Sequence, residues 1–330
     1  MRDVRRLVVR APNWIGDAVL SLAAVRDLRR NFPAARIEVL ARPWVGALYG
    51  AVPEVDAVRE SRGALHDGRA LYGQFDAAAL LTNSFATALA VWLAGTPERW
   101  GYATDGRSPL LTRSPGVPRE VRGVSEVYYH RAMLAGVGLC VSAAPDNHLA
   151  PPPAWRGKGV AKLGGEGDWV GLNPGAAYGS AKRWLPERYA SLGDRLARRT
   201  GARIAILGGA AERPLAESIA AQMSAPARVL SGETSLPELI GLIQALRLLI
   251  TNDSGPMHLA AALGTPLVAL FGPTDWTETA PVGTRHRLLR EPVECAPCKL
   301  RECPIDHRCM RLLGVDRVVE ASIGLLGEPS

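Results

Sequence analysis

The stretch LLITNDSGPMHLAAALGTPLVALFGPTD, residues 248–275, decides which fold we expect. An apolar run ends at Thr251, a polar turn follows, and an alanine-rich segment of helical character begins near Ser254. A second apolar run, TPLVALFGP, comes directly afterwards. A strand, a helix and another strand in this order form a parallel β-α-β unit, so the sequence predicts an α/β fold with a parallel sheet.

The same alternation extends in both directions along the chain. The runs RLVVR, RIEVLA and DAAALL precede helical segments in the first half, and DWVGLNPG and ARIAILGG do so in the second. Between the halves, the clustered prolines of APDNHLAPPPAW, residues 144–155, interrupt regular structure. We therefore expect two Rossmann-like domains, residues 1–155 and residues 156–330, with ligands bound beyond the carboxyl ends of the strands.

The composition is that of a globular protein whose partners are anionic. The 330 residues are 47% hydrophobic and 22% charged, and the formal net charge is +7. Only 6% of residues are aromatic, and no basic stripe is interleaved with aromatics, so nucleic acid is not expected as a partner. The N-terminus lacks the apolar core of a signal peptide, which indicates a cytoplasmic protein that can associate peripherally with an anionic membrane surface.

Three strand-to-helix turns carry residue types suited to phosphate. After the strand that ends at Thr251, Gly255 allows close approach to the backbone N–H groups of a helix start, with Asp253, Ser254 and His258 around it. The alternative is that Asp253 and Ser254 only cap the helix and that His258 packs in the core.

The other two turns follow strands earlier in the second half. In GLNPGAAYGSAKRWLPERY, residues 171–189, Lys182 could reach a diphosphate, or it could be an ordinary solvated cation. In ILGGAAERPLAE, Glu212 could bond ribose hydroxyls or merely favour the helix dipole. The patterns GxGxxG, GxxxxGK[ST] and HExxH are absent from the sequence, which disfavours dehydrogenases, P-loop proteins and zinc proteases.

Several motifs together resemble one enzyme family. NWIGDAVLSLAAVRDLR, NPGAAYGSAKRWLPERYA, LGGAAERPLAE, TNDSGPMHLAAALGTPLVALFGPTDW and CAPCKLRECPIDHRCM occur in the order found in the ADP-heptose:lipopolysaccharide heptosyltransferases of glycosyltransferase family nine. Among these, the sequence is most similar to the heptosyltransferase II branch. The resemblance covers nearly the whole chain and is least informative between about residues 50 and 125.

This resemblance implies a GT-B fold, with the acceptor on the N-terminal domain and the nucleotide sugar on the C-terminal one. It implies inverting transfer of heptose from ADP-L-glycero-β-D-manno-heptose to the lipopolysaccharide inner core, with heptose II added to heptose I, at the cytoplasmic face of the inner membrane. No metal cofactor is required in this scheme, although the diphosphate could carry Mg²⁺.

The family's motifs also give individual residues their expected roles. Lys182 matches a catalytic cation on the diphosphate, and the donor-binding set is Glu212, Asp253, Ser254, Gly255 and His258. Asp17 matches the base that takes the proton of the acceptor hydroxyl. The alternative for Asp17 is a first-turn residue that only favours the helix dipole.

Acceptor binding is expected on the N-terminal domain, where Asn13 lies beside Asp17 in the sequence. The inner core is anionic, so we expect basic side chains at the edge of the acceptor site. The candidates are Arg62, Arg99, Arg107 and Arg113. We favour Arg107, since the glycine-containing turn in GYATDGRSPLLT would present it. The alternative for each is an ordinary surface arginine.

Four of the five cysteines, Cys295, Cys298, Cys303 and Cys309, lie close together in the sequence. A structural zinc site, reduced thiols and a disulfide are the alternatives for them, and we expect no metal site.

Three other functions share features with this sequence. They are a family-nine transferase with another donor or acceptor, a nucleotide-sugar epimerase, and a nucleotide-sugar-binding protein without activity. An epimerase would release nucleotide without a glycan acceptor, and a binding protein would release none.

Overall fold

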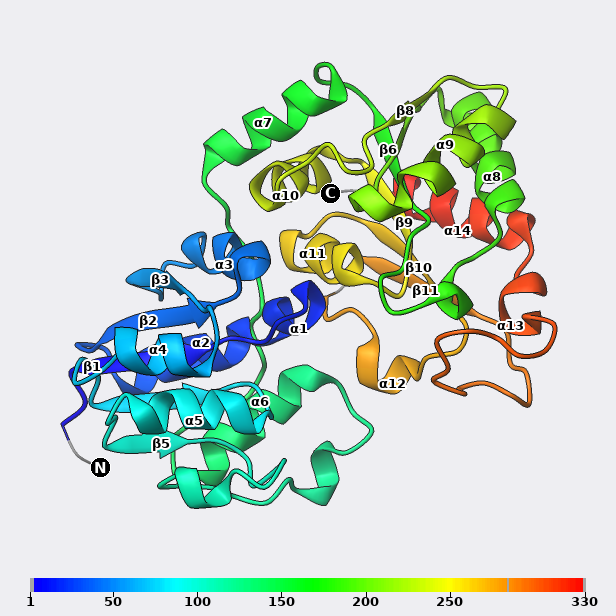
Figure 1. Cartoon of the computed structure of the whole chain (residues 1–330). Helices are drawn as coiled ribbons and strands as arrows, with labels where there is room; N and C mark the ends of the chain where they lie inside the picture. Colours follow the sequence, from blue (N-terminus) through cyan, green and yellow to red (C-terminus); the bar gives the residue numbers. More distant parts are fainter. Residues whose placement is uncertain (1–2, 284, 329–330) are drawn as a thin grey trace. The chain divides into compact units, whose positions relative to one another are not determined.

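The computed structural model describes residues 3–283 and 285–328, which fall into two compact units, one up to Asn147 and the other from His148. Each unit is built on a parallel sheet with helices between its strands, as the sequence predicts (Figure 1). The division falls ahead of the triple proline. The expectation that this cluster interrupts regular structure holds only for its first part, because the last proline, Pro153, begins a helix. No helix within the described ranges is long and apolar enough to span a membrane.

The first unit contains a five-stranded sheet in the order β3-β2-β1-β4-β5. Its elements along the chain are β1 Arg6–Arg10, α1 Ile15–Leu20, α2 Leu22–Asn31, β2 Arg36–Ala41, α3 Pro43–Gly50, β3 Ala57–Glu60, α4 Ala64–Ala70, β4 Ala77–Leu80, α5 Phe85–Leu93, β5 Glu98–Trp100, the 3-10 turns η1 Ser108–Leu110 and η2 Arg119–Val121, and α6 Glu126–Gly136.

The sheet of the first unit is held by apolar residues on its central strands. In β1 every residue after Arg6 is buried, as expected for a parallel strand covered on both faces. Val8 packs with Leu40, Ala78 and residues of α5 in one core cluster. Each large apolar side chain that is fully buried contributes about 1.5–3 kcal/mol to folding. This packing fixes β1, and with it the turn that leads into α1.

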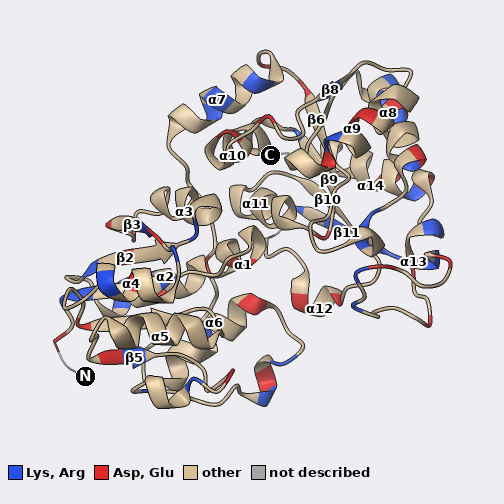
Figure 2. Ribbon diagram, in the orientation of Figure 1, with Lys and Arg blue, Asp and Glu red and all other residues tan. Residues whose placement is uncertain are grey.

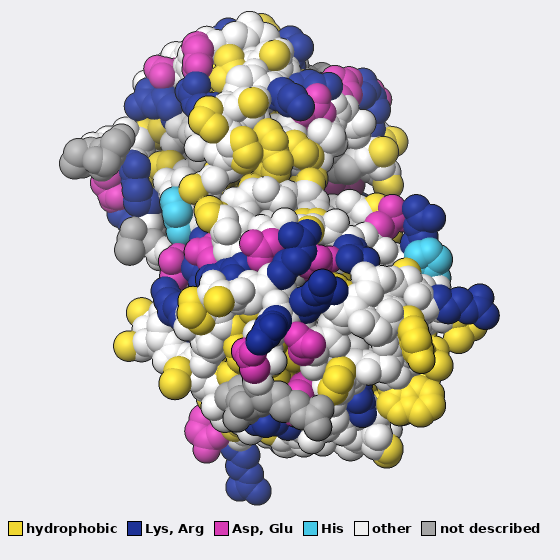
Figure 3. Space-filling model, turned by 90° about the vertical axis from the view of Figure 1, so that its left-hand side faces the viewer, with side chains coloured by type: hydrophobic (Ala, Val, Ile, Leu, Met, Phe, Trp, Pro, Cys, Tyr) yellow, Lys and Arg dark blue, Asp and Glu magenta, His cyan; other side chains and the backbone are white. Residues whose placement is uncertain are grey.

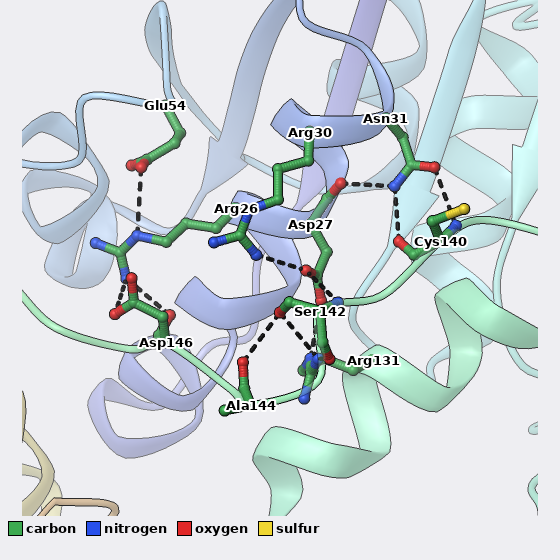
Figure 4. Close-up of polar contacts among 10 residues, drawn as sticks. All are labelled: Arg26, Asp27, Arg30, Asn31, Glu54, Arg131, Cys140, Ser142, Ala144 and Asp146. Carbon is green, nitrogen blue, oxygen red and sulfur yellow. Dashed lines mark hydrogen bonds and ion pairs between the residues drawn. The ribbon is translucent and has the colours of Figure 1, made fainter.

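A polar network fastens the last segment of the first unit to α2 (Figure 4). The carboxylate of Asp27, fully buried, accepts from Arg131 of α6 at 2.8 Å and from the backbone N–H of Ser142 at 3.0 Å. Burial raises the pKa of Asp27, but these hydrogen bonds outweigh it, and the pKa lies below its ordinary value. Arg26 donates to the backbone carbonyl of Asp146 at 2.7 Å, so the chain is held down to the end of the unit.

The second unit contains a six-stranded sheet in the order β11-β10-β9-β6-β7-β8. Its elements are α7 Pro153–Leu163, β6 Trp169–Asn173, η3 Ser180–Lys182, α8 Pro186–Thr200, β7 Arg203–Ile206, η4 Ala210–Glu212, α9 Arg213–Gln222, β8 Ala227–Val229, α10 Leu236–Ala245, β9 Leu248–Asn252, α11 Gly255–Leu263, β10 Leu267–Phe271, α12 Trp276–Thr279, β11 His286–Arg290, α13 Arg308–Arg311 and α14 Val315–Gly327.

The first helix of the second unit packs unusually closely on α10. A Cβ atom at Gly241 would lie 1.7 Å from the carbonyl oxygen of Trp155, and one at Gly159 would lie 2.1 Å from the backbone nitrogen of Leu242. Only glycine permits this approach of two helix backbones. Helix α7, which follows the proline cluster, is thereby built into the second unit.

The C-terminal helix α14 also packs within the second unit. Val318, Val319 and Leu325 join its core cluster. Arg195 of α8 pairs with Asp316 of α14 at 2.5 Å. Figure 2 shows basic and acidic segments interspersed around α8. The face drawn in Figure 3 likewise shows Lys and Arg side chains beside Asp and Glu, so the positive charge on that face is dispersed among acidic groups.

Candidate functional site

Three neighbouring strands of the second unit end beside the residues expected to bind the donor. Strands β9, β6 and β7 are adjacent and parallel, so their carboxyl ends share one edge of the sheet. Asp253 follows β9, Lys182 follows β6, and Glu212 follows β7. The order in which the chain adds strands reverses between β6 and β9, and open α/β sheets bind their ligands at such a switch point.

Lys182 and Asp253 form an ion pair at this edge. The ammonium of Lys182 donates to Oδ2 of Asp253 at 2.8 Å, and the hydroxyl of Thr279 donates to the same oxygen at 3.2 Å. The two charged side chains are only 12% and 5% exposed. The ring of Tyr178 lies 5.0 Å from the ammonium and supports the cation from another side. The lysine is therefore held at the start of α11 rather than solvated, so the alternative of an ordinary surface cation is wrong.

The start of α11 offers backbone donors. Ser254 is the N-cap residue, but its side chain makes no cap hydrogen bond within the described residues. Its hydroxyl instead accepts from Asn173 at 3.1 Å and pairs with Thr251 at 3.1 Å. The helix begins at Gly255 and contains no charged residue, as its uniform tan colour in Figure 2 shows. Among the described residues neither Asp253 nor Ser254 acts as a side-chain cap, so the capping part of that alternative is wrong.

His258 lies one turn into α11 and is buried. Burial lowers the pKa of His258 to about 4, a shift that Asp253 opposes and Lys182 reinforces. The imidazole is therefore neutral near pH 7. Its Nδ1 atom has no hydrogen-bond partner among the residues that the structure describes. A neutral ring adds no charge beside the ion pair.

Asn252, which the sequence reasoning missed, joins the loops of this edge. Its side-chain oxygen accepts from the backbone N–H of Trp184 at 3.1 Å and from the hydroxyl of Tyr189 at 3.0 Å. Its amide nitrogen donates to the carbonyl of Pro174 at 2.7 Å. A buried asparagine at the end of an apolar strand is the signal that could have revealed it, because its amide must find partners.

Glu212 lies at the next strand end, in the 3-10 turn after β7. Its carboxylate accepts from the backbone N–H of Gly209 at 2.8 Å, which closes the turn around the carboxylate. The same carboxylate lies against the loop after β6, since a Cβ atom at Gly175 would come within 2.0 Å of it. Whether Glu212 also binds ribose stays a prediction.

The cysteine segment, residues 295–309, packs against the turn that carries Lys182. His307 Nε2 lies 2.7 Å from the carbonyl oxygen of Ala181, the residue before the lysine. The N–H of Ala181 donates to the carbonyl of Arg301 at 2.9 Å. A hydrogen bond on each side of Ala181 thus ties the lysine turn to the cysteine segment.

The cysteines themselves are free thiols in the described structure. They line a cavity of about 90 Å³, and burial raises the pKa of Cys309 to about 11. Within residues 3–283 and 285–328, no three His, Cys, Asp or Glu side chains are arranged to hold a metal ion.

In the first unit, Asp17 lies in the first turn of α1, directly after β1, and is half-buried. Asn13 is exposed in the loop between them, and its side-chain oxygen accepts from Arg10 at 2.8 Å. Burial lowers the pKa of Arg10 to about 10, with a further contribution from Arg42. Both candidates for the acceptor side thus stand at the carboxyl end of the central strand, and their roles stay predictions.

Arg107 is placed differently from our expectation. Its turn does not present it to solvent, because the side chain is fully buried and donates to the carbonyl oxygens of Tyr102, at 2.9 Å, and Thr82. The left-handed backbone of Asp105 and Gly106 turns the chain so that the guanidinium points inward. Burial lowers the pKa of Arg107 to about 10. Any contact with an acceptor would require this side chain to leave its carbonyl partners.

Comparisons with known proteins show the family to which this chain is similar. The model of glycosyltransferase family 9 (heptosyltransferase) matches residues 65–308. Lipopolysaccharide heptosyltransferase 2 of Escherichia coli K12 is 33% identical over 310 residues, covering 86% of this chain and 88% of that protein. The enzyme of the same name from Salmonella typhimurium is also 33% identical, with the same coverage.

Solved structures show the same relation. The structure of E. coli ADP-heptose lps heptosyltransferase II matches with a TM-score of 0.85 at 29% identity, over 97% of this chain and 98% of that one. The family 9 glycosyl transferase of Veillonella parvula matches with a TM-score of 0.84 at 22% identity, over 98% and 97%, and shows the fold alone. On the sequence match and the shared fold, this chain belongs to glycosyltransferase family 9, the heptosyltransferases, and has their GT-B fold.

Proposed function

We propose that this protein transfers heptose from ADP-L-glycero-β-D-manno-heptose to the lipopolysaccharide inner core, adding heptose II to heptose I with inversion at the anomeric carbon. Two relatives at 33% identity are lipopolysaccharide heptosyltransferases 2, and the similarity to them extends over most of the chain. The single observation that carries the donor side is the Lys182–Asp253 pair at the start of α11.

The donor diphosphate would lie at this helix start. The N–H groups around Ser254 and Gly255 would donate to its oxygens, and Lys182 would exchange part of its contact with Asp253 for the diphosphate. As the bond to the anomeric carbon breaks, the electron pair and the negative charge go to ADP. A fixed cation and oriented backbone dipoles stabilise that charge better in the transition state than in the ground state. Mg²⁺ would be an optional companion of the nucleotide.

The acceptor would bind to the first unit. Asp17 would take the proton from the attacking hydroxyl of the inner core while that oxygen bonds to the anomeric carbon. General-base catalysis of this kind is worth about 10²- to 10⁴-fold in rate. Because this acceptor is built on a lipid, the protein would work peripherally at the cytoplasmic face of the inner membrane.

The test is acceptor-dependent release of ADP. Purified protein is given ADP-heptose with and without a heptose-terminated inner-core oligosaccharide, and ADP-glucose serves as the control donor. We expect rapid ADP release only with ADP-heptose and acceptor together. Release without acceptor would favour an epimerase, and ADP binding without any release would favour a binding protein.

A further inference from the structure

We propose that Trp44, Trp14 and Phe85 form an aromatic platform that binds a sugar ring of the acceptor glycan; this inference rests on the proposed function. All three side chains are exposed, Trp14 to 60%, Trp44 to 58% and Phe85 to 43%. Large aromatic side chains gathered at a protein surface mark binding sites more often than single exposed residues do.

The topology brings these residues to one edge of the first sheet. Trp44 lies in the first turn of α3 after β2, Trp14 is the N-cap of α1 after β1, and Phe85 begins α5 after β4. Strands β2, β1 and β4 are direct neighbours and parallel. Because neighbouring strands lie about 4.8 Å apart, the three strand ends span about 10 Å, the width of one to two sugar rings.

Hydrogen bonds fix parts of this platform. The indole N–H of Trp44 donates to the carbonyl oxygen of Asn13 at 2.7 Å, which ties Trp44 to the loop that carries Trp14. The guanidinium of Arg42 lies 5.9 Å from the centre of the Trp44 ring. The backbone N–H of Phe85 donates to Asp105 at 2.7 Å. An indole held by its N–H loses little freedom when a ligand binds to its face.

The polar groups on the same edge point to a carbohydrate rather than a lipid. Asn13, Asn83, Ser84 and Asp105 are exposed there, and Asp17 is half-exposed. A sugar ring presents C–H groups that suit the negative face of an aromatic ring, and hydroxyls that suit amide and carboxylate groups. A membrane-binding surface would instead surround its aromatics with several lysines and arginines. The edge also carries Asp17, so a sugar on the platform would lie close to the proposed base.

The test compares alanine variants of the platform with a matched control. Trp92 is 49% exposed and lies near the far end of α5, away from the strand ends, so Trp92→Ala removes an equally exposed indole from the same unit. We expect Trp44→Ala and Phe85→Ala each to raise the acceptor KM roughly three- to tenfold, with kcat and the donor KM unchanged. Trp44→Phe, which keeps a ring, should recover most of the loss.

A binding measurement separates failure of this inference from failure of the proposed function. Isothermal titration calorimetry with the inner-core oligosaccharide reports acceptor binding without any transfer, and its signal does not depend on the tryptophans that the variants remove. If the wild type transfers no heptose but the oligosaccharide binds, and Trp44→Ala weakens that binding, the platform stands and the proposed reaction fails. Equal effects of Trp92→Ala and Trp44→Ala, or no effect of either, would overturn the platform. If the alanine variants keep the wild-type acceptor KM but lose binding to anionic phospholipid vesicles, the three aromatic residues bind a membrane and not the glycan.

Discussion

Replacing Lys182 by Met separates the structural role of the Lys182–Asp253 pair from its proposed catalytic role. At 2.8 Å and an effective dielectric constant of about 20, the two charges attract by roughly 6 kcal/mol, which the loss of their hydration largely offsets. The variant leaves the Asp253 carboxylate, which is 5% exposed, with Thr279 as its remaining side-chain donor in the described structure. Leaving a buried charge unpaired costs about 3 kcal/mol of stability.

Adding Asp253→Asn should remove most of that penalty, because no buried charge then lacks a partner. We expect the double variant to recover about 2 kcal/mol, measured as the shift of the urea unfolding midpoint at constant slope. Turnover should behave differently. Lys182→Met should lower kcat about 10²- to 10³-fold, the usual cost of one lost charge-stabilising group, and the second substitution should not restore it.

Lys182→Arg is the control, because it keeps the positive charge and should keep most of the stability. Two results would refute the reasoning. A double variant as unstable as Lys182→Met would show that the pair is not the source of the penalty. Wild-type ADP release by Lys182→Met would remove the lysine from the reaction.

Three further predictions concern separate parts of the chain. Asp17→Asn should reduce acceptor-dependent ADP release about 10²- to 10⁴-fold while ADP binding, measured by calorimetry, is unchanged; wild-type turnover would exclude it as the base. Asp27→Asn should cost about 3 kcal/mol at pH 7, since it leaves Arg131 buried and unpaired. Because the folded pKa of Asp27 is depressed, its contribution is present above the unfolded pKa of about 3.9 and disappears as the pH falls through the folded value. The difference in unfolding free energy between the wild type and Asp27→Asn should therefore begin to narrow below about pH 4, and a constant difference would contradict this. His307→Ala should lower kcat through loss of its bond to Ala181, and His307→Gln should restore activity if that bond positions the lysine turn.

The central strands were predictable because they are continuous apolar runs. RLVVR and RIEVLA coincide with β1 and β2. The strands that the sequence did not reveal, β3, β5, β8 and β11, lie at the edges of the sheets. They are short or only partly buried, so their composition resembles that of loops. Strand order is likewise decided by packing between distant segments.

The candidate site was predictable where its chemistry is local. A strand, a polar turn and a helix start follow one another around Asp253, and the structure has them in that order. Contacts between distant segments were not predictable. The ion pair to Lys182, the partners of Asn252 and the burial of Arg107 each depend on backbone groups that only the folded sheet brings together.

The network of Figure 4 has a consequence for the segment by which the chain passes from the first unit to the second. Arg26 holds the backbone of Asp146, and the N–H of Leu149 donates to the carbonyl of Ala262 at 2.8 Å in the second unit. The backbone is thus anchored on both sides of the division, three residues apart, and α14 ends within the second unit. The chain therefore passes from one unit to the other within a short stretch of backbone between two anchored points. A passage this short leaves the chain little slack, whereas a long linker would leave many backbone dihedral angles free.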